Sequence, residues 1–362
     1  MITKESSLLR IGVLGCGPIA QFAHFDACRK GRNTELYAIC DAASDLLERM
    51  ADMHRPAKTY ARFDDMLNDP NVEAVIVATS DQFHVSLCTQ ALDAGKHVFV
   101  EKPLGVSVEE CEALRAHFHA IRSRGHRIFQ VGNNRRFDPG VQFAHKFVQE
   151  EIGGLIALKS WYCDSTQRYT MTDNLQPIPI ASANAVRPGG NPKADKRKYF
   201  MLTHGSHLVD LARFLAGEIE SVTAKLVEKY DSHCWFISAD FKGGHVGHFD
   251  LTVPLRGDFQ EGFQIYGEFG SVYGKIPLPW YHKSGDVECF SVKDRQFRRV
   301  LGEDAYTYKL QLEAFADSVL HDKPQTGATV DDGAAALRAM VAIARAVESQ
   351  TAVRLDAVTG TV

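Results

Sequence analysis

The sequence predicts an α/β protein in two parts: a doubly wound parallel sheet with helices on both faces, then an α+β domain with a large, open, mostly antiparallel sheet. Up to about residue 131, short apolar runs alternate with amphipathic stretches. After about residue 150, strand-like runs follow one another with little helix between them. Because 362 residues exceed what one hydrophobic core commonly serves, we expect domains 1–131 and 132–362.

The first part alternates short buried strands with helices. The apolar runs that predict strands are 9–14, 36–40, 74–78, 98–100 and 128–131. Between them, segments such as 82–94 and 108–124 carry apolar residues at helical spacing and end near Gly95 and Gly125. This alternation is typical of a parallel sheet that is covered on both faces.

The second part is richer in strands. Its predicted strands are 157–163, 221–229, 234–241, 245–253, 263–269 and 287–292. An amphipathic helix is expected over 199–216, which Gly217 can terminate. Helices over 308–320 and 331–349 close the chain and are placed to pack back on the first domain.

The composition excludes several classes of partner. A net charge of -4 and a pI near 6.4 give no basic surface for nucleic acid or for an anionic membrane. No apolar run approaches the roughly 20 residues of a spanning helix. Eight scattered cysteines without a C-x-x-C pair favour neither a disulfide framework nor a metal site. We therefore expect a cytoplasmic protein whose partners are a small molecule and further copies of itself.

A glycine-rich turn follows the first predicted strand. Residues 15–20 match the pattern G-x-G-x-x-A, in which Gly15 and Gly17 permit a tight turn and close approach to a pyrophosphate. Pro18 and Ile19 then open a helix, whose free N–H groups favour negative charge. The pattern alone is a weak signal, because glycines also occur where a strand simply turns into a helix.

An acidic residue strengthens the case for a dinucleotide. Asp41 ends the second apolar run, 24 residues past Gly17, close to where a carboxylate hydrogen-bonds the adenosine ribose. The same carboxylate would repel a 2'-phosphate, and Ala42 and Ala43 offer no arginine to bind one. The sequence therefore predicts a Rossmann domain that prefers NAD to NADP. The alternative is that Asp41 only caps a helix.

Five motifs, taken in order, resemble the glucose-fructose oxidoreductase, inositol dehydrogenase and rhizopine-catabolism (Gfo/Idh/MocA) family over almost the whole chain. They are the glycine-rich turn, Ala78-Thr79-Ser80-Asp81 with His84, Glu101-Lys102-Pro103, Gly132-Asn133-Asn134-Arg135-Arg136-Phe137, and Gly205-Ser206-His207-Leu208-Val209-Asp210. The resemblance implies an NAD(P)-dependent oxidoreductase. It also implies cofactor contacts from Thr79, Ser80, His84, Glu101 and Lys102.

The resemblance assigns the chemistry to Lys102 and His207. Lys102 follows a strand end, where open parallel sheets bind their ligands, and in the family this lysine contacts the reacting hydroxyl. A lysine beside an oxidised nicotinamide has a lowered pKa, so it can accept the hydroxyl proton. From the residues alone, a surface lysine at a strand end is equally possible. His207 matches the family's acid–base histidine.

Other positions of the motifs carry weaker expectations. Family members that act on inositols usually carry an Asp at Thr203, one helical turn before His207, and a threonine cannot carry that charge. Thr203 is kept as a substrate-binding candidate, and the resemblance implies that Arg135 faces the substrate. Arg136 is expected to be structural. For Asp210 and His204 we favour structural roles: Asp210 bound to the backbone or to Arg213, and His204 packed in the core.

A long polar loop over 164–198 precedes the helix that carries His207. Loops of this length inside a domain are usually functional, so we interpret it as a substrate lid, with Asp164, Arg168 and Tyr169 as hydroxyl-binding candidates. A solvated basic loop at a subunit contact is the alternative.

These observations predict an NAD(H)-dependent dehydrogenase or reductase for a secondary CH–OH or ketone of a sugar, sugar derivative or cyclitol. NAD-dependent redox-assisted glycoside cleavage and a non-catalytic nucleotide- or sugar-sensing regulator are the alternatives, since the family includes both. The open sheet predicts a homodimer or homotetramer, because an uncovered apolar face is unfavourable in water. The sequence does not name the substrate or the physiological direction.

Overall fold

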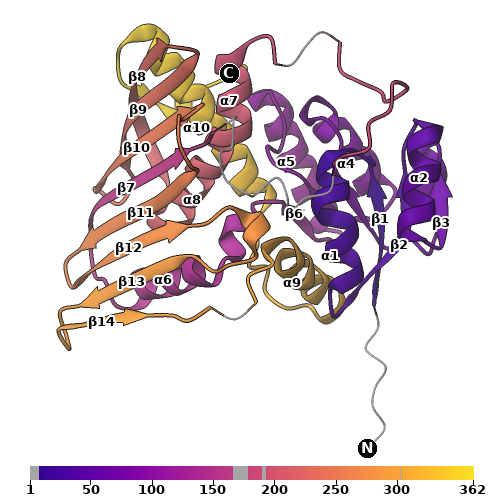
Figure 1. The fold of residues 1–362 in the computed structure, drawn as a ribbon, viewed down its shortest axis with the longest axis horizontal. Helices are drawn as coiled ribbons and strands as arrows, with labels where there is room; N and C mark the ends of the chain where they lie inside the picture. The colour runs from indigo at the N-terminus through magenta and orange to yellow at the C-terminus, as the bar shows by residue number, and fades with distance from the viewer. Residues whose placement is uncertain (1–7, 166–177, 190–192, 303) are drawn as a thin grey trace, which may run out of the picture.

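The computed structural model describes residues 8–165, 178–189, 193–302 and 304–362. Two sheets lie side by side with helices between and around them (Figure 1). The first sheet is built from residues 9–131, and the second contains the later strands of the described part of the chain. This is the predicted combination of a doubly wound parallel sheet with a larger, mostly antiparallel one.

The first sheet has six parallel strands in the order β3-β2-β1-β4-β5-β6. Its strands are β1 (Leu9–Leu14), β2 (Thr34–Cys40), β3 (Lys58–Tyr60), β4 (Ala74–Val77), β5 (His97–Val100) and β6 (Phe129–Val131). The order reverses between β1 and β4, and at such a point the carboxyl ends of the strands leave a crevice for a ligand. Every residue of β4 is buried, as expected for a strand between two helical layers.

Helices cover both faces of the first sheet. They are the π-helical turn η1 (Ala20–His24), α1 (Phe25–Lys30), α2 (Ser44–His54), α3 (Phe63–Leu67), the 3-10 turn η2 (Asp81–Phe83), α4 (His84–Asp93) and α5 (Val108–Arg122). Two later helices, α9 (Thr307–His321) and α10 (Val330–Ser349), pack against α1 and α5 respectively. The end of the chain therefore folds back on the first sheet.

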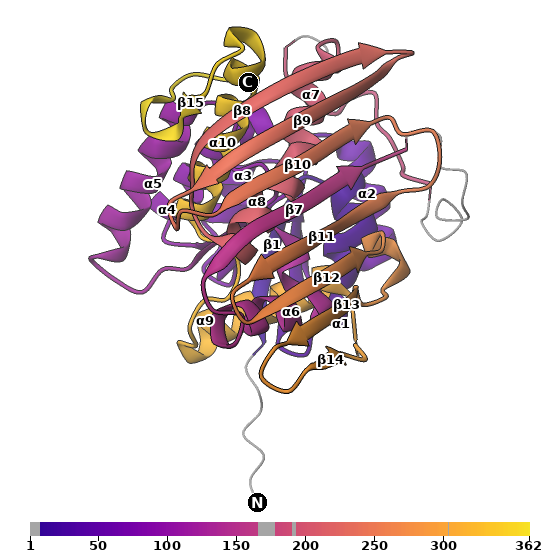
Figure 2. The ribbon, with the colours of Figure 1, turned by 90° about the vertical axis from the view of Figure 1, so that its left-hand side faces the viewer.

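The second sheet has nine strands in the order β14-β13-β12-β11-β7-β10-β9-β8-β15. They are β7 (Leu155–Cys163), β8 (Ile219–Lys229), β9 (Ser232–Phe241), β10 (Val246–Val253), β11 (Gln260–Gly267), β12 (Gly270–Ile276), β13 (Asp286–Ser291), β14 (Gln296–Arg299) and β15 (Val353–Arg354). β7 and β10 pair in parallel, and all other neighbours are antiparallel. One face points away from the rest of the molecule, with the helices behind it (Figure 2).

The helices behind this sheet carry or support the candidate site. They are the 3-10 turn η3 (Asn134–Phe137), α6 (Pro139–Glu150), α7 (Lys196–Phe200), the π-helical turn η5 (Met201–Gly205) and α8 (Ser206–Ala216). Two short 3-10 turns, η6 (Pro279–Tyr281) and η7 (Leu355–Ala357), complete the structure. α7, η5 and α8 follow one another without a break, so the predicted helix over 199–216 contains a π turn. Among the described residues, no helix is both long and apolar enough to cross a membrane.

Candidate active site

A cavity of about 660 Å³ opens at the carboxyl ends of β1, β2 and β4, where the strand order reverses. The predicted cofactor residues that line it are Gly15, Gly17, Pro18, Ile19, Asp41, Thr79 and Ser80. Most of the exposed wall is apolar, with contributions from Leu46, Phe63 and Phe83. A cavity with few polar groups and apolar walls suits a nucleotide base and its sugar.

Glycine is needed at the two positions of the turn for different structural reasons. Gly15 has φ +94°, and a Cβ there would lie 2.8 Å from the carbonyl oxygen of Ala78, so both conformation and space require glycine. Gly17 has open space where its Cβ would lie, and this space belongs to the cavity. A ligand phosphate can therefore approach the backbone at Gly17. The cradle fits a dinucleotide pyrophosphate.

Asp41 lies on the cavity wall, held by two backbone groups. Its Oδ2 accepts from the backbone N–H of Cys16 at 2.8 Å, and its Oδ1 accepts from the N–H of Ala43 at 2.9 Å. The carboxylate thus connects the end of β2 to the glycine-rich turn. These bonds orient the carboxylate beside the cavity.

His84 and Glu101 lie behind the cavity wall. The ring of His84 is buried, with Nδ1 2.8 Å from the carbonyl oxygen of Pro103 and Nε2 3.2 Å from that of Thr79. Glu101 is buried and hydrogen-bonds to Nε2 of His24 at 2.9 Å. Burial raises the pKa of Glu101, but the hydrogen bond and charge of His24 outweigh it and the net shift is downward. Both side chains hold loops that carry Thr79 and Lys102.

Lys102 reaches from the first sheet to the helix of His207. Its Nζ donates to the carbonyl oxygen of Thr203 at 2.9 Å. Thr203 belongs to η5, and a π turn breaks the regular hydrogen-bond ladder of a helix, which makes carbonyl groups available to side chains. The Thr203 hydroxyl donates instead to the carbonyl oxygen of Tyr199 at 2.6 Å. The backbone of Thr203, not its side chain, therefore meets Lys102.

The environment of Lys102 and His207 favours their neutral forms. Burial lowers the pKa of Lys102, and the nearby charge of Arg135 lowers it further against the opposing effect of Glu101. Burial also holds the pKa of His207 well below its usual range, and the charges of Lys102, Arg135 and His204 act in the same direction. Neutral amine and imidazole groups can accept a proton.

Tyr162 organises the two histidines of the helix. The ring of His207 stacks on the ring of Tyr162, with centroids 5.4 Å apart and planes 6° apart. The ring of His204 lies 5.6 Å from the same tyrosine, and its Nδ1 is 3.6 Å from Oδ2 of Asp164. Asp164, at the end of β7, thus reaches the helix of His207 through His204. The sequence analysis favoured core packing for His204, and the structure adds this contact with an acid.

Arg135 forms a buried ion pair that the sequence analysis did not foresee. Its Nε and Nη2 lie 3.0 and 2.7 Å from the two carboxylate oxygens of Glu261 on β11. Burial raises the pKa of Glu261 to about 6, although the charge of Arg135 opposes this shift. The sequence held a signal for the burial of Glu261. Side chains alternate between the two faces of a strand, so Glu261 shares the inward face with Phe263 and Ile265.

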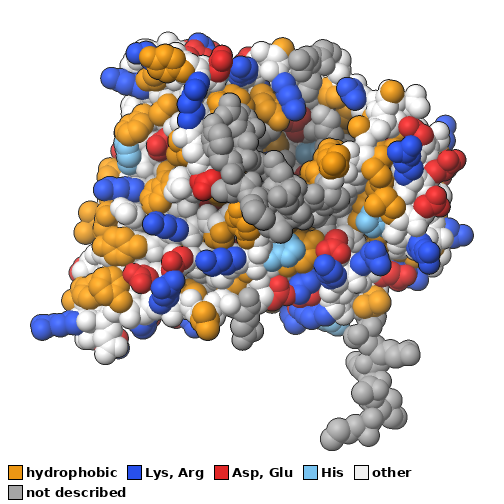
Figure 3. Space-filling model, in the orientation of Figure 1, with side chains coloured by type: hydrophobic (Ala, Val, Ile, Leu, Met, Phe, Trp, Pro, Cys, Tyr) orange, Lys and Arg blue, Asp and Glu red, His pale blue; other side chains and the backbone are white. Residues whose placement is uncertain are grey.

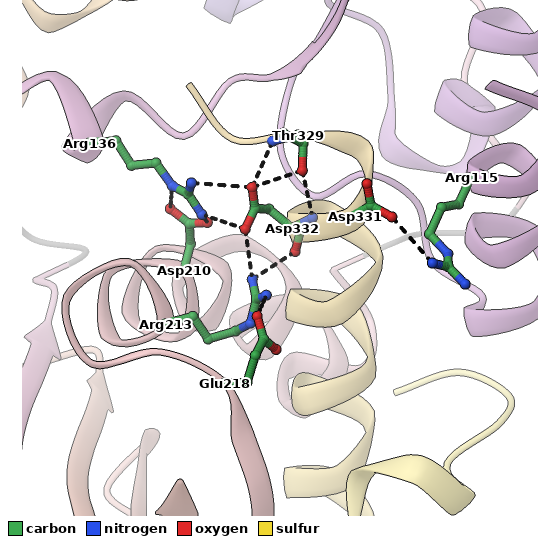
Figure 4. Close-up of polar contacts among 8 residues, drawn as sticks. All are labelled: Arg115, Arg136, Asp210, Arg213, Glu218, Thr329, Asp331 and Asp332. Atoms are coloured by element: carbon green, nitrogen blue, oxygen red, sulfur yellow. Dashed lines mark hydrogen bonds and ion pairs between the residues drawn. The ribbon is translucent and has the colours of Figure 1, made fainter. Parts of the chain in front are cut away.

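Arg136 belongs to a second buried ion cluster, behind the site. Its guanidinium lies between the carboxylates of Asp210 and Asp332, and Arg213 lies between Asp332 and Glu218 (Figure 4). Asp210 therefore binds Arg136, not Arg213 or the backbone as favoured from the sequence. The structural role expected of Arg136 agrees with these contacts. The cluster fixes α8, which carries His207, against η3 and the first turn of α10.

Two predicted site residues, Arg168 and Tyr169, lie outside the described residues. The described middle of the same loop reaches the first sheet, where Ala185 and Val186 line the dinucleotide cavity. All eight cysteines are free thiols. Within the described part of the chain, no group of three or more His, Cys, Asp or Glu side chains could hold a metal ion.

Comparisons with known proteins match both parts of the chain. A family model described as "Oxidoreductase family, NAD-binding Rossmann fold" (GFO_IDH_MocA) matches residues 9–132, and one described as "Oxidoreductase family, C-terminal alpha/beta domain" matches residues 195–355. Myo-inositol 2-dehydrogenase of Thermotoga maritima is 25% identical over 365 aligned residues, covering 97% of this chain and 100% of that protein.

Solved structures share the fold over nearly the whole chain. An oxidoreductase domain protein from Kribbella flavida superposes with a TM-score of 0.79 at 20% identity, covering 96% of this chain and 99% of that one. A levoglucosan dehydrogenase in complex with NADH and levoglucosan superposes with a TM-score of 0.76 at 21% identity, covering 96% and 100%. At these identities the likeness shows the two-domain fold.

Proposed function

The chain belongs to the Gfo/Idh/MocA family of oxidoreductases, and on this basis we propose that it is an NAD(H)-dependent dehydrogenase acting on a secondary CH–OH, or the corresponding ketone, of a sugar, sugar derivative or cyclitol. One observation carries the proposal. The amine of Lys102 crosses from the dinucleotide sheet to the backbone of η5, one helical turn before His207. Two proton acceptors thus lie together where both halves of the molecule meet.

We assign the cofactor as NAD. The carboxylate of Asp41, fixed at the cavity wall, is placed to accept from ribose hydroxyls and to repel a 2'-phosphate. When bound, NAD supplies the acceptor or donor of the hydride. The Gly17 backbone and the start of η1 would hold its pyrophosphate, and Thr79 and Ser80 would lie along it.

Lys102 takes the hydroxyl proton in this proposal. A lysine with a lowered pKa is neutral in a larger fraction at working pH, so it can accept the proton while hydride leaves the carbon. The carbonyl oxygen of Thr203 orients the amine. His207, kept neutral by burial, is the second acceptor. In the reductive direction the same groups return the proton.

The substrate would lie between Lys102 and His207, and its other hydroxyls would meet polar groups at the ends of β7 and η3. We propose Arg135 and Asp164 for these contacts, with Arg168 and Tyr169 from the adjoining loop. Thr203 contributes mainly through its carbonyl, because its hydroxyl is bound within its own helix. Relatives named for inositol and a neighbour named for levoglucosan support a polyhydroxylated ring as substrate.

The direct test is a screen of purified protein with NAD+ or NADP+ against sugars, cyclitols and anhydrosugars, with absorbance at 340 nm as the readout. We expect NAD-dependent oxidation of at least one compound, at a rate that the Lys102→Met variant lowers by about 10²-fold or more. The protein could also bind NADH yet neither oxidise any of these compounds nor reduce the corresponding ketones. That outcome would contradict an enzymatic role and favour a sensor.

We also propose that the protein forms a homodimer or homotetramer through the open face of the second sheet. That face carries aromatic side chains among charged ones, including Trp161, Phe236 and Tyr273. Hydrophobic side chains also mark the corresponding flank of the molecular surface (Figure 3). A second copy would remove this apolar area from water.

A further inference from the structure

The segment between β7 and α7 in the sequence includes residues 180–186, which lie against the dinucleotide-binding half. Both of its ends belong to the part of the chain that builds the second sheet, yet residues 180–186 lie against η1 and α2. In Figure 1 the described part of this segment, in the colour that precedes α7, lies in the neighbourhood of α4 and α2. We call residues 180–186 the strap.

The first attachment of the strap is Gln21. Its Oε1 accepts from the backbone N–H of Ile180 at 2.9 Å, and its Nε2 donates to the carbonyl oxygen of the same residue at 2.9 Å. Nε2 also donates to the carbonyl oxygen of Cys16 at 2.8 Å. One side chain therefore ties the strap to the turn that cradles the pyrophosphate.

The second attachment is Asp45, in the first turn of α2. Oδ1 of Asp45 accepts from the hydroxyl of Ser182 at 2.7 Å and from the side-chain amide of Asn184 at 3.5 Å. The Ser182 oxygen accepts in turn from the backbone N–H of Asn184 at 3.0 Å. Ser182 is buried, only 5% exposed, although it lies in a loop. The strap is therefore docked by specific bonds.

Beyond these attachments the strap enters the cavity wall. Ala185 and Val186 line the same cavity as Asp41, Ala42 and Leu46, at the end where the acid marks the adenosine ribose. Ala185 packs against the hydrophobic core of this half, whereas Val186 is 67% exposed. A ligand bound in the cavity would cover this exposed apolar side chain and remove it from water.

We propose that the strap is a cofactor-binding element that covers the adenosine half of the dinucleotide and slows its release. The inference rests on the proposed function only in so far as the cavity takes NAD(H). It requires no substrate. Release of the cofactor then requires the strap to leave Gln21 and Asp45, or the dinucleotide to pass beneath it.

The test measures NADH release by stopped-flow displacement, followed by the fluorescence of the bound nicotinamide. Ser182→Ala removes the hydroxyl that holds Asp45 and Asn184, and we expect dissociation on the order of 10-fold faster, the effect of losing one or two hydrogen bonds. Ser221→Ala is the control, because it removes a similar hydroxyl contact to Asp240 on the second sheet. It should leave the rate unchanged.

A charge placed on the strap provides a second, independent test. Ala185→Asp puts a carboxylate on the cavity wall near Asp41, and we expect NADH affinity to fall by about 10-fold or more through repulsion and lost packing. Ala183→Asp places the same charge on the same strap, at an exposed position that does not line the cavity. Its affinity should stay within about twofold of the wild type.

The outcomes separate this proposal from the function proposed above. Wild-type rates and affinities in both Ser182→Ala and Ala185→Asp overturn the strap as a binding element, and equal losses in Ala183→Asp do so as well. A wild-type protein that does not bind NADH also overturns it. Tight NADH binding that these variants weaken, without turnover of any polyol, supports the strap while contradicting the dehydrogenase.

Discussion

At the scale of single residues, the proposed site centres on Lys102, whose partly buried amine lies near charges of both signs. Burial and Arg135 favour its neutral form, and Glu101 favours its charged form. Its hydrogen bond to the Thr203 carbonyl fixes where the nitrogen lies in either state. In the proposed mechanism, this hydrogen bond orients the amine that accepts the proton.

The role of Lys102 is tested by Lys102→Met, which keeps the length of the side chain but removes the amine. Turnover should fall by something like 10² to 10⁴ if general base catalysis is its role, while NAD affinity should barely change. His207→Ala should lower turnover less, and the double variant should lose less than the product of both because the groups act together. A folded, NAD-saturated Lys102→Met enzyme within a few fold of the wild type would contradict this.

The preference for NAD is tested at Asp41 by calorimetry. NAD should bind more tightly than NADP, and Asp41→Ser with Ala42→Arg should narrow or reverse the difference by replacing repulsion with a cation. Asp41 also orders the glycine-rich turn through the backbone of Cys16. The double variant should therefore bind NAD less tightly than the wild type does. Equal or tighter binding of NADP by the wild type would show the assignment to be wrong.

Glu261 predicts a pH dependence of stability. Its pKa is raised from the ordinary 4.5 to about 6 in the folded protein, so the folded state binds the proton more strongly than the unfolded state. The sign follows: this contribution is fully present below pH 4.5 and is lost as pH rises through about 6. It amounts to about 2 kcal/mol.

The variant Glu261→Gln lacks this titration. The difference in free energy of unfolding between wild type and Glu261→Gln should therefore change by about 2 kcal/mol between pH 4.5 and 7, and urea denaturation at several pH values measures it. A difference that is constant over this range would show that Glu261 keeps its ordinary pKa.

At the scale of elements, the cluster around Asp332 joins three segments far apart in the sequence. Asp332 is the third residue of α10, where it accepts from the backbone N–H and the hydroxyl of Thr329 in a capping box, and it also meets Arg136 and Arg213. The neighbouring Asp331 binds Arg115 of α5. The first turn of α10 thus holds α8 and α5 at the same time.

The buried pair Arg136–Asp210 gives a stability prediction. Arg136→Met leaves the carboxylate of Asp210, only 2% exposed, without its bidentate partner and should cost about 3 to 5 kcal/mol. Adding Asp210→Leu should recover most of that loss. As a control, Arg354→Met breaks the exposed pair with Glu220 and should cost less than about 1 kcal/mol. Equal costs for both arginines in urea denaturation would contradict the argument.

The sequence predicted those elements whose signal is local. β1 was placed at the observed residues, and the predicted helix ends near α9 and α10 are correct to within a residue or two. β3, β12, β14, β15 and α6 were not predicted. β12 contains Gly270 and Gly274, which lower its strand propensity, and it is stabilised by its neighbours on both sides. β15 has only two residues, paired with β8.

The candidate site also has residues that local sequence predicts and residues that it does not. Gly15, Gly17 and Asp41 could be placed on one cavity because strand ends fix their positions. The partner of Arg135 is 126 residues away on β11, and no local pattern connects the two. The π turn that presents the Thr203 carbonyl is also invisible in the sequence, because it depends on how α7 and α8 are joined.

At the scale of the whole molecule, the second sheet is a single layer with one face in water. A row of paired residues crosses this face through Lys225, Phe236, Asp250 and Trp161. Phe236 is 52% exposed, whereas Trp161 is half-buried because its ring lies over Gly262, where no Cβ intervenes. Phe236 and Trp161 lie on either side of Asp250 in this row, and aromatic residues are enriched on surfaces that a partner covers.

The assembly can therefore be tested by placing a charge in that row. The wild type should have the mass of a dimer or tetramer by light scattering at micromolar concentration, and Phe236→Arg should shift it toward smaller species, because a buried unpaired cation opposes association. Met53→Arg is the matched control: Met53 is 56% exposed on α2, away from the sheet, and its variant should keep the wild-type mass. A monomeric wild type would contradict the proposed interface. An oligomer that Phe236→Arg leaves intact would show that the copies meet through another face.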